Sequence, residues 1–324
     1  SVLITGGAGF VGSAIALSLR SEFPSLRVTA LDNLHRAGSE LNLPRLADAG
    51  VGFAKGDVRE PGDVKRAGDH EWIIECSAEP SAQAGYGGSP DYLVRTNLFG
   101  AYHCLEAARV AGSKFLFLST SRVYPYRTLN DLAFRETATR FELEDAQPVS
   151  GASARGVCER FPMDGARSLY GMTKLAAEQM TLEYADAYGI TAIVNRFGLI
   201  AGPWQMGKAD QGVLTLWMAA HYFGRPLKYI GFGGTGKQVR QIKDPAAYAG
   251  QIWNAGGGRA HSLSLLECTD LCRSISGRSI AIAPDLHDRP ADVRIYLTDS
   301  SKLIDASGWA PTRGAEETLR DIHE

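Results

Sequence analysis

The stretch Ser1-Val2-Leu3-Ile4-Thr5-Gly6-Gly7-Ala8-Gly9-Phe10-Val11-Gly12 decides the fold of this chain. Its three consecutive apolar residues, 2–4, are typical of a parallel strand that is buried on both faces. Glycines follow at once, and residues 13–20 then have the pattern of a helix. A strand, a glycine turn and a helix bring a phosphate group to the backbone N–H groups at the helix N-terminus. The stretch therefore predicts the phosphate-binding start of an α/β domain.

The glycine spacing indicates which phosphate ligand to expect. Gly7-x-Gly9-x-x-Gly12 matches the fingerprint of dinucleotide-binding βαβ units, and the set 6, 9 and 12 matches its wider-spaced variant. A second strand is predicted at 28–31 and is followed by Asp32, where a carboxylate holds the 2′-hydroxyl of an adenosine ribose. We therefore expect NAD rather than NADP. The expected contacts are Gly6, Gly9, Phe10, Val11, Gly12, Asp32 and Asn33.

The composition excludes several classes of protein. The 324-residue chain has a formal net charge of −2 and no basic stripe, so we expect no nucleic-acid partner. No apolar run approaches the roughly 20 residues of a membrane span. The chain opens on its first predicted strand, so we expect neither a signal peptide nor a membrane partner. Five scattered cysteines make no disulfide framework and favour a reducing, cytoplasmic location.

Cys268 and Cys272 have a spacing that invites comparison with a metal site. They lie in a stretch with a capping box (Ser264 and Glu267), helical periodicity and a closing Gly277. Because no second ligand pair lies nearby in the sequence, we expect two buried helix cysteines and no metal.

Strand and helix patterns alternate through the first two thirds of the chain. Further strands are predicted at 51–54, 72–74, 115–118 and 191–196, and helices at 97–111 and 170–188. This alternation predicts an α/β fold with a Rossmann-type, doubly wound parallel sheet. The segment 125–167 is long, polar and without clear period, and a stretch of this kind is either a functional loop or carries structure that the sequence pattern does not reveal.

The pattern changes after Gly202-Pro203, where glycine clusters interrupt the chain and strict alternation is lost. We expect a smaller, mixed α/β C-terminal domain that binds substrate. The predicted division is an NAD-binding domain at 1–197 and a substrate domain at 198–324, with some later segments returning to the first.

Tyr170 and Lys174 place a phenol and an ammonium group one helical turn apart on one face of a predicted helix. A nearby ammonium and a cationic nicotinamide both favour the phenolate, which is suited to take a proton from a hydroxyl as hydride leaves the carbon for NAD. A hydroxyl from Ser119-Thr120-Ser121, at the end of a predicted strand, would hold the same oxygen. The alternative is an ordinary helix pair, and the preceding dinucleotide fingerprint favours catalysis.

Together these motifs resemble the extended short-chain dehydrogenase/reductase family of sugar-nucleotide epimerases and dehydratases. The resemblance rests on Thr5–Gly12, Asp57-Val58, Asn97-x-x-Gly100, Ser119–Tyr124, Tyr170-x-x-x-Lys174, Gly233–Arg240 and Arg289-Pro-x-Asp292. Within the family, the segments 202–212 and 233–240 look most like the CDP-paratose (CDP-tyvelose) 2-epimerase branch.

The resemblance implies roles for individual residues. Tyr170 is implied as the base, Lys174 as the group that orients the nicotinamide ribose, and Thr120 as the strand-end hydroxyl. Further cofactor contacts are implied at Asp57, Val58, Ser77, Ala78 and Asn97. Substrate contacts are implied at Glu79, Ser121, Arg122, Tyr124, Gln205, Gln211, Arg240, Arg289 and Asp292. A nucleotide-sugar substrate and a homodimer are also implied; for the arginines at 240 and 289, a solvated surface pair is the alternative.

The chain departs from the family pattern at positions that concern the substrate. Relatives usually read His-Leu-Ala-Ala-Gln after the fourth strand, whereas this chain reads Glu75-Cys-Ser-Ala-Glu79. A family asparagine is replaced by Leu199, and Arg-Asp-x-x-His is replaced by Arg240-Gln-Ile-Lys-Asp244. We expect these departures to alter the sugar and to leave the redox chemistry intact. Candidates to line a lid are Arg135, Glu136, Arg140 and Arg155.

Three hypotheses of function follow. The first is an NAD-dependent epimerase that oxidises a sugar carbon, with C2 favoured, and returns hydride to its opposite face. The second is a dehydrogenase or epimerase of another nucleotide sugar or nucleoside-type substrate, 4-epimerisation included; a 4,6-dehydratase is disfavoured because Ser121-Arg122 stands where an acidic pair belongs. The third is a non-catalytic NAD-binding regulator, against which the intact set of Thr120, Tyr170 and Lys174 argues.

Overall fold

The computed structural model describes residues 1–207, 211–243 and 251–324. Contacts group them into two compact units. Unit 1 comprises residues 1–119, 172–195 and 251–252, and unit 2 comprises 120–171, 196–207, 211–243 and 253–324. These units divide the chain at other points than the predicted boundary after residue 197, because the segment 120–171 packs with the C-terminal part. The assignment of cofactor and substrate to separate domains stays a prediction.

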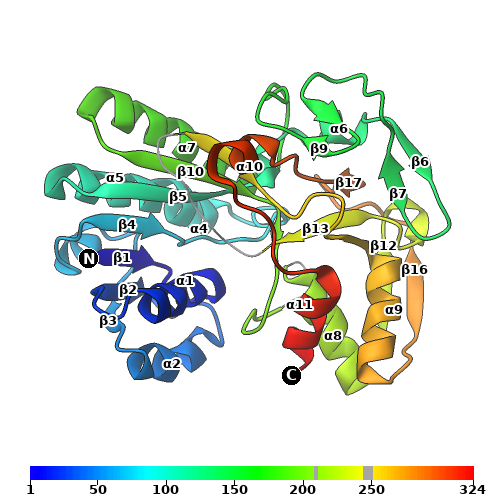
Figure 1. The fold of residues 1–324 in the computed structure, drawn as a ribbon, viewed down its shortest axis with the longest axis horizontal. Coiled ribbons are helices and arrows are strands. Elements are labelled where there is room, and N and C mark those ends of the chain that lie inside the picture. Colours follow the sequence, from blue (N-terminus) through cyan, green and yellow to red (C-terminus); the bar gives the residue numbers. More distant parts are fainter. Residues whose placement is uncertain (208–210, 244–250) are drawn as a thin grey trace. The chain divides into compact units, whose positions relative to one another are not determined.

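A seven-stranded sheet in the order β14-β10-β5-β4-β1-β2-β3 organises unit 1 (Figure 1). The pairs β1 with β2, β1 with β4, β2 with β3 and β4 with β5 are parallel. The strands are β1 (Val2–Thr5), β2 (Val28–Asp32), β3 (Gly52–Lys55), β4 (Trp72–Glu75), β5 (Lys114–Thr120), β10 (Ala192–Phe197) and β14 (Ile252–Ala255). The predicted doubly wound sheet is confirmed, and β14 is a strand that the sequence pattern did not predict.

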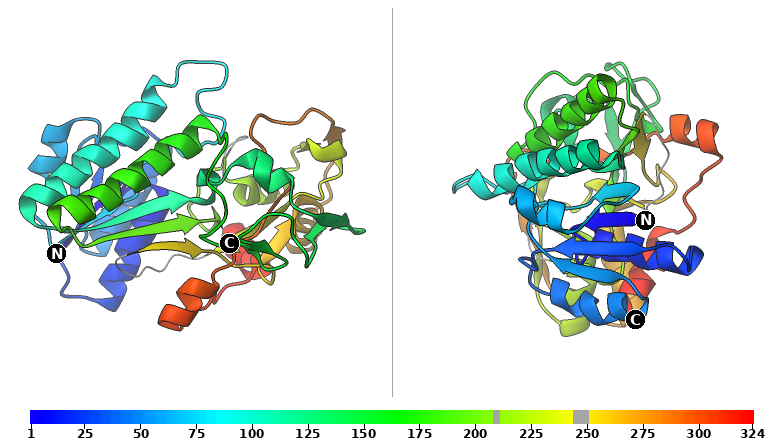
Figure 2. Two further views of the ribbon diagram at one scale, coloured as in Figure 1. Left: turned by 90° about the horizontal axis from the view of Figure 1, so that it is seen from above. Right: turned by 90° about the vertical axis from the view of Figure 1, so that its left-hand side faces the viewer.

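Helices cover both faces of this sheet because alternate residues of a strand point to opposite sides. Leu3 packs in a cluster with Leu105 of α5, whereas Ile4 packs in another with Ala16 of α1. Accordingly α5 and α7 lie side by side over one face, and α1 and α2 lie on the other (Figure 2). The helices are α1 (Phe10–Glu22), α2 (Asn42–Asp48), α3 (Pro61–Arg66), α4 (Asp91–Val94), α5 (Gly100–Ala111) and α7 (Leu169–Tyr188), with a 3₁₀ turn at Ser39–Leu41.

The helix predicted from residue 97 begins earlier and is irregular. A π-helical segment, Arg95–Phe99, joins α4 to α5 without a break. π-Helical turns inside α-helices occur frequently at functional sites. The position of Asn97 on this segment matters for the site described below.

Unit 2 is built around β13 (Val239–Lys243). This strand runs parallel to β11 (Leu199–Ile200) and β17 (Ile295–Tyr296), and antiparallel to β15 (Ser262–Ser264). Three helices, α8 (Val213–Phe223), α9 (Leu265–Ser276) and α11 (Ala315–His323), share an apolar core. The further elements are β12 (Leu227–Ile230), η4 (Phe232–Gly234), β16 (Ile282–Asp285) and α10 (Ser301–Ser307). The mixed α/β character predicted for the C-terminal part is confirmed.

Of the two alternatives for the segment 125–167, the structure shows the second, because the segment has secondary structure of its own. This segment contains α6 (Tyr126–Asn130) and two short antiparallel hairpins, β6 (Phe134–Glu136) with β7 (Phe141–Leu143) and β8 (Ala152–Ser153) with β9 (Gly156–Val157). Strands of two or three residues are too short to produce a visible alternation in the sequence. Their stability comes from packing in unit 2, which the local pattern does not reveal.

The capped helix predicted around the two cysteines is confirmed. Ser264 and Glu267 form a capping box at the start of α9, and Cys268 and Cys272 are fully buried. Within the described ranges no group of three or more His, Cys, Asp or Glu side chains is placed to hold a metal ion. None of the helices described is long and apolar enough to cross a membrane.

Candidate functional site

The glycine loop between β1 and α1 is packed so tightly that two of its positions accept only glycine. Gly6 has φ +62°, and a Cβ added there would lie 3.0 Å from the carbonyl of Cys76. A Cβ on Gly12 would lie 2.2 Å from the Gly6 carbonyl oxygen. Gly9 occupies the N-cap of α1 and provides no capping side chain. The first N–H groups of this helix therefore suit a phosphate, as the sequence predicted.

Asp32 lies at the end of β2, beside this loop. Its carboxylate accepts the backbone N–H groups of Ala8 (3.0 Å) and Leu34 (2.8 Å). Burial raises the pKa of Asp32, and these hydrogen bonds oppose the rise. A carboxylate held in this position fits the ribose contact expected of it.

Asn33 and Asp57 join the ends of β2 and β3. The Asn33 amide donates to Asp57 Oδ2 at 2.8 Å, and Arg59 donates to both oxygens of the same carboxylate. Burial would raise the pKa of Asp57, but hydrogen bonds from Arg59 and Asn33 bring it down to about 2. The structure thus brings Asp32, Asn33 and Asp57 together, and the tight glycine cradle beside a carboxylate fits a dinucleotide.

Asn97 connects the loop after β4 to α7. Its Oδ1 accepts the N–H of Glu79 at 2.8 Å, and its Nδ2 donates to the Glu79 carbonyl (3.2 Å) and to Thr173 Oγ1 (3.3 Å). These three hydrogen bonds, here called the Asn97 bracket, hold the half-buried Ser77 and Ala78 next to the glycine loop, where Gly6 is close to Ser77. The predicted cofactor residue Asn97 therefore shapes the site through the backbone.

Val58 is buried against the start of α5. A Cβ on Gly100 would lie 2.7 Å from Val58 Cγ2, and His103 Nδ1 contacts the Val58 carbonyl oxygen at 2.8 Å. Its side chain belongs to the core of unit 1, next to the predicted adenine position at Asp57.

In unit 2, the turn after Thr120 adjoins the first turn of α7. Thr120 Oγ1 accepts the N–H of Arg122 at 3.2 Å and so caps the 3₁₀ turn η3 (Ser121–Val123). A hydroxyl that accepts one hydrogen bond still has its own O–H to donate. A Cβ on Gly171 would lie 2.1 Å from the Arg122 carbonyl oxygen, so this contact requires glycine directly after the buried Tyr170. The predicted Thr120 and Tyr170 thus lie on adjoining segments.

Ser119, the neighbour of Thr120, is directed elsewhere. Its Oγ donates to the carboxylate of Glu178, a fully buried residue of α7 in unit 1. Because the Ser119 hydroxyl already donates to Glu178, Thr120 is the better candidate for the hydroxyl that binds a substrate.

Lys174 lies one turn after Tyr170 on α7 and faces the interior of unit 1. Its Nζ lies 3.6 Å from Glu75 Oε2 and 4.1 Å from the centroid of the Phe117 ring. Burial raises the pKa of Glu75 to about 7, and the charge of Lys174 opposes this rise. Sequence reasoning missed Glu75 as a neighbour of Lys174. The available signal was a carboxylate that directly ends the apolar run of β4.

Three predicted substrate residues meet in unit 2. Arg240 Nη2 lies 3.0 Å from Asp292 Oδ1, and Arg122 Nη2 lies 3.8 Å from the same oxygen. Arg240 also donates to the carbonyls of Val239 and Val293. Burial lowers the pKa of Arg240 to about 10, and Asp292 opposes the shift, so the guanidinium remains charged at neutral pH. Arg240 is therefore partly enclosed and holds Asp292 and the neighbouring backbone in place. This arrangement does not fit the alternative of a solvated surface residue.

Tyr124 lies inside unit 2. Its side chain is about 1% exposed, its hydroxyl donates to Asn254 Oδ1 at 2.8 Å, and it accepts from Arg196 Nη1 at 3.2 Å. Burial raises the pKa of Tyr124 to about 12. These contacts favour a structural role over the predicted substrate contact.

The remaining predicted substrate residues are distributed over unit 1 and unit 2. Gln205 is buried, donates to the Ile200 carbonyl and accepts from Thr215 Oγ1, which also favours a structural role. Ser121, Gln211 and Arg289 are half-buried in unit 2, and Glu79 is half-buried in unit 1. Residues 208–210 of the 202–212 motif, and Asp244, lie outside the described residues.

The charged residues predicted to line a lid are engaged within unit 2. Arg140 donates to Glu267 Oε1 of α9 at 2.7 Å, Arg135 pairs with Glu142 at 2.7 Å, and Glu136 pairs with Lys237 at 2.7 Å. Arg155 lies 3.3 Å from Asp299. The pair of Arg135 with Glu142 joins the two strands of the β6–β7 hairpin, and the pairs of Glu136, Arg140 and Arg155 connect the 125–167 segment to the rest of the unit.

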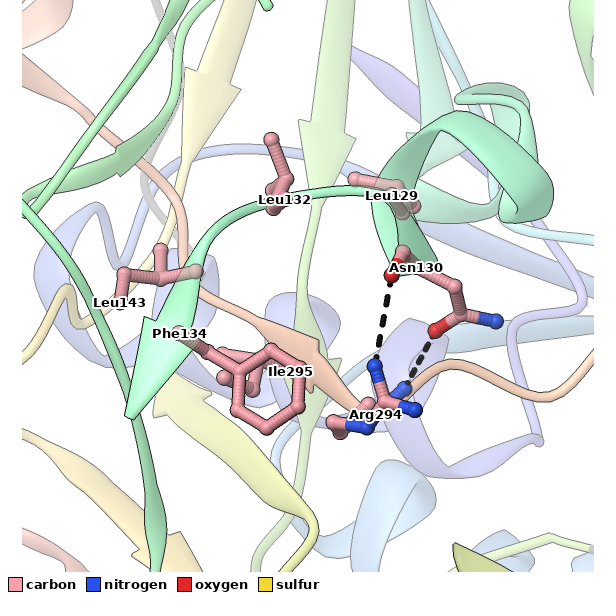
Figure 3. A pocket seen from close by; sticks show the side chains of 7 residues that line it. All are labelled: Leu129, Asn130, Leu132, Phe134, Leu143, Arg294 and Ile295. Carbon is pink, nitrogen blue, oxygen red and sulfur yellow. Dashed lines mark hydrogen bonds between the residues drawn. The ribbon is translucent and has the colours of Figure 1, made fainter. Parts of the chain in front are cut away.

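A small hollow lies beside the Asp292 loop (Figure 3). It is lined by residues from α6, β6, β7 and β17, and has an empty volume of about 150 Å³. Arg294 closes one side, its N–H donating to Asn130 Oδ1 at 2.8 Å and its guanidinium stacking over Phe134. This volume includes open solvent, and the hollow leaves no space for a water-sized sphere, so it is too small for a nucleotide.

Comparison with known proteins agrees with this geometry. A model of the NAD dependent epimerase/dehydratase family matches residues 2–249. The CDP-paratose 2-epimerase of Salmonella typhi is 28% identical, and the match covers 100% of this chain and 98% of that protein. A dTDP-glucose 4,6-dehydratase of Streptomyces niveus is 25% identical over 96% of this chain and 88% of its own length.

Solved structures show the same fold. The UDP-glucose 4-epimerase of Thermus thermophilus, crystallised with NAD, has a TM-score of 0.78 at 24% identity and covers 99% of this chain and 97% of its own. The UDP-glucuronic acid 4-epimerase of Bacillus cereus has a TM-score of 0.79 at 21% identity, with 99% and 97% covered.

Proposed function

Because the chain belongs to the NAD dependent epimerase/dehydratase family, we propose that it epimerises a nucleotide-activated sugar by transient oxidation of C2. The observation that carries this proposal is the placement of Tyr170 and Lys174 one turn apart on α7, with Thr120 on the segment that adjoins the start of that helix. The similarity to a CDP-paratose 2-epimerase over the whole chain supports C2 as the carbon inverted.

The cofactor is NAD, and the residues of unit 1 fit it. The first N–H groups of α1 would hold the pyrophosphate, Asp32 the adenosine ribose, and Lys174 the nicotinamide ribose. Bound there, NAD supplies a reversible acceptor for hydride. An epimerase uses its cofactor without net consumption, so we expect tight retention.

The proton chemistry belongs to Tyr170. Its phenolate oxygen would take the proton of the sugar hydroxyl while the carbon is oxidised, and would return that proton when the carbon is reduced again. The Lys174 ammonium favours the phenolate. Thr120 would donate its O–H to the same substrate oxygen and so hold it in place.

Nucleotide binding is proposed for the cluster around Asp292. Arg122 and Arg289 would hold the diphosphate, for which guanidinium groups offer bidentate hydrogen bonds, and Arg240 would keep Asp292 in position. In unit 1, Glu79 would face the sugar. This placement makes a carboxylate part of sugar selection.

The strand end also bears on dehydration, the other reaction of the family. Elimination needs an acid and a base next to the strand-end hydroxyl, and Ser121 and Arg122 occupy those positions. One nitrogen of Arg122, Nη1, donates to the Ala291 carbonyl at 3.0 Å, and a guanidinium, which keeps its proton at neutral pH, does not replace such an acid and base. These observations support epimerisation over dehydration.

The proposal is tested by identifying the small molecules released from the purified protein, and then by screening CDP-, UDP-, GDP- and ADP-sugars by NMR. Inversion at C2 in deuterated water with the original hydrogen retained is the expected result. Solvent deuterium at C2 would contradict direct hydride return. Inversion at C4, or net accumulation of NADH, would replace the proposal by the alternative of another epimerase or a dehydrogenase.

We also propose a homodimer formed through α5 and α7. Apolar side chains are exposed along both helices, among them Tyr102 and Val110 of α5 and Met172 and Tyr188 of α7; Val110 is 72% exposed. In light scattering, the chain of 34.9 kDa should show twice that mass. Val110→Asp should shift it toward the monomer, while Leu286→Asp, at an exposed position in unit 2, should leave it unchanged.

A further inference from the structure

Glu75 is a charged residue in a position where charge is rarely buried. It ends β4 in the centre of the parallel sheet, and its side chain is 1% exposed. Neither carboxylate oxygen makes a well-formed hydrogen bond among the described residues. The Lys174 ammonium at 3.6 Å and, more weakly, the Ser77 amide stabilise its charge. A buried carboxylate without better partners requires an explanation.

Lys174 is enclosed in the same place. Its side chain is 3% exposed, and its Nζ lies between the Glu75 carboxylate and the face of the Phe117 ring. Two cysteines lie near enough to Glu75 to be affected by its charge. Cys76 is the next residue in the chain, and Cys104 belongs to α5. Burial and the charge of Glu75 raise the pKa of both thiols, so they stay neutral. The ion pair described for Lys174 is the one with Glu75.

We propose that Glu75 is a positioning residue which holds the Lys174 ammonium and cancels part of its charge, and thereby favours the oxidised form of the bound cofactor. The inference rests on the proposed function, in which Lys174 contacts the nicotinamide ribose. The nicotinamide ring carries a positive charge in NAD⁺ and none in NADH. An ammonium alone would disfavour NAD⁺, and a carboxylate paired with it removes that penalty. An epimerase starts each turnover from the oxidised cofactor, so this preference serves its reaction.

The expected size of the effect follows from Coulomb's law. Two unit charges about 10 Å apart shift an equilibrium about two-fold in bulk water, and more in a partly buried site. Glu75→Gln removes the charge and keeps the shape. It should therefore reduce the preference for NAD⁺ by at least about two-fold.

The test measures cofactor preference instead of turnover. The purified protein is equilibrated at pH 8 with equal concentrations of NAD⁺ and NADH, and the retained nucleotides are released and quantified. The wild type should retain more NAD⁺ relative to NADH than Glu75→Gln does. In a Lys174→Met background the same substitution should leave the ratio unchanged, because Lys174 opposes the rise that burial causes in the pKa of Glu75, and without it Glu75 takes up a proton and carries no charge. Glu106→Gln, at a carboxylate of α5 in unit 1 that pairs with Arg109, should keep the wild-type ratio.

A second measurement needs no variant. Protonation of Glu75 at pH 6 should lower the NAD⁺ preference of the wild-type protein toward that of Glu75→Gln. Comparing the wild-type protein at pH 8 and pH 6 therefore tests the inference even if Glu75→Gln fails to fold.

The inference would be overturned by equal ratios in the wild type and Glu75→Gln, by the same change in Glu106→Gln, or by persistence of the change without Lys174. Retention of neither nucleotide by the wild type would instead overturn the proposed function.

Discussion

Asn97 and Glu79 are joined by two hydrogen bonds. The backbone N–H of Glu79 donates to Asn97 Oδ1 at 2.8 Å, and Asn97 Nδ2 donates to the backbone carbonyl of Glu79 at 3.2 Å. A third bond from the same amide reaches Thr173 on α7. One buried side chain thus sets the path of the loop after β4 and fastens it to the helix that carries Lys174.

Replacing Asn97 by alanine should remove all three bonds and leave buried backbone groups without partners. We expect the free energy of unfolding to fall by about 2–3 kcal/mol, measured by urea denaturation, and NAD retention to weaken. Asn130→Ala is the matched control, because Asn130 accepts from the Arg294 N–H and donates to the Asp292 carbonyl in unit 2. It should lose stability and keep its cofactor. Unchanged NAD retention in Asn97→Ala would contradict the role of the bracket.

Gly12→Ala should disrupt the cofactor site. The added methyl group would overlap the Gly6 carbonyl oxygen at 2.2 Å, and the loop has no room to yield. We expect a loss of at least about 2 kcal/mol in stability and no measurable NAD retention. Gly88→Ala should be nearly neutral in both measurements, since an added Cβ there meets nothing within 4 Å. Normal cofactor retention in Gly12→Ala would refute the tight packing of this loop.

Tyr170→Phe should lower kcat about 1,000-fold, because general acid–base catalysis usually contributes between about 100-fold and 10,000-fold. NAD should remain bound, as the ring is retained. Tyr184→Phe supplies the control on the same helix: its hydroxyl donates to Glu106 Oε1 at 2.7 Å, away from the proposed chemistry. It should change kcat less than about two-fold. Comparable losses in the two variants would argue against Tyr170 as the base.

The buried carboxylate of Glu75 should make stability depend on pH. Burial raises its pKa from 4.5 to about 7 in the folded state, so the folded protein binds more protons than the unfolded chain between these values. Stability should therefore fall as pH rises from about 4.5 to 7 and level off above, with up to about 3 kcal/mol at stake. Urea unfolding of the wild type and Glu75→Gln at several pH values measures this, and the difference between them should grow toward pH 7. A difference independent of pH would contradict the raised pKa.

Glu267 fastens the β6–β7 hairpin to α9. It completes the capping box with Ser264 and accepts hydrogen bonds from Thr139 and Arg140. Glu267→Ala should lower the free energy of unfolding by about 3 kcal/mol, since it leaves a partly buried guanidinium unpaired. Glu316→Ala, which breaks an exposed pair with Arg320, should have an effect below about 0.5 kcal/mol. Denaturant titration distinguishes the two, and equal effects would contradict the proposed bracing.

Much of unit 1 was predictable because its strands are short apolar runs bounded by glycines and polar turns. β1, β2, β4, β5 and β10 all show this pattern, and the glycine spacing identifies the cofactor. β14 was missed because Ile252-Trp-Asn-Ala255 is brief and follows a break in the alternation. β14 joins the sheet only because the chain comes back to it from the C-terminal part, and a local sequence pattern does not show such long-range pairing.

The candidate site was predictable where a motif fixes spacing along one element, as for Tyr170 and Lys174 on α7. Contacts between distant segments were not. Glu75 meets Lys174 only because a sheet and a helix pack together, and Tyr124 proved to be buried although its motif pointed to substrate. Burial and pairing of charged groups depend on the tertiary fold, and spacing alone does not determine them.

The π-helical segment at 95–99 gives the chain an unusual sensitivity to length. A π turn contains one residue more than an α-helical path would use. Deletion of a single codon there would allow one regular helix from Asp91 to Ala111, and would rotate the preceding residues by about 100° around the axis. Asn97 would then turn away from its partners. A chain without this extra residue would have a more regular helix and would lose the hydrogen bonds of Asn97, so the position of one side chain depends on the irregular turn.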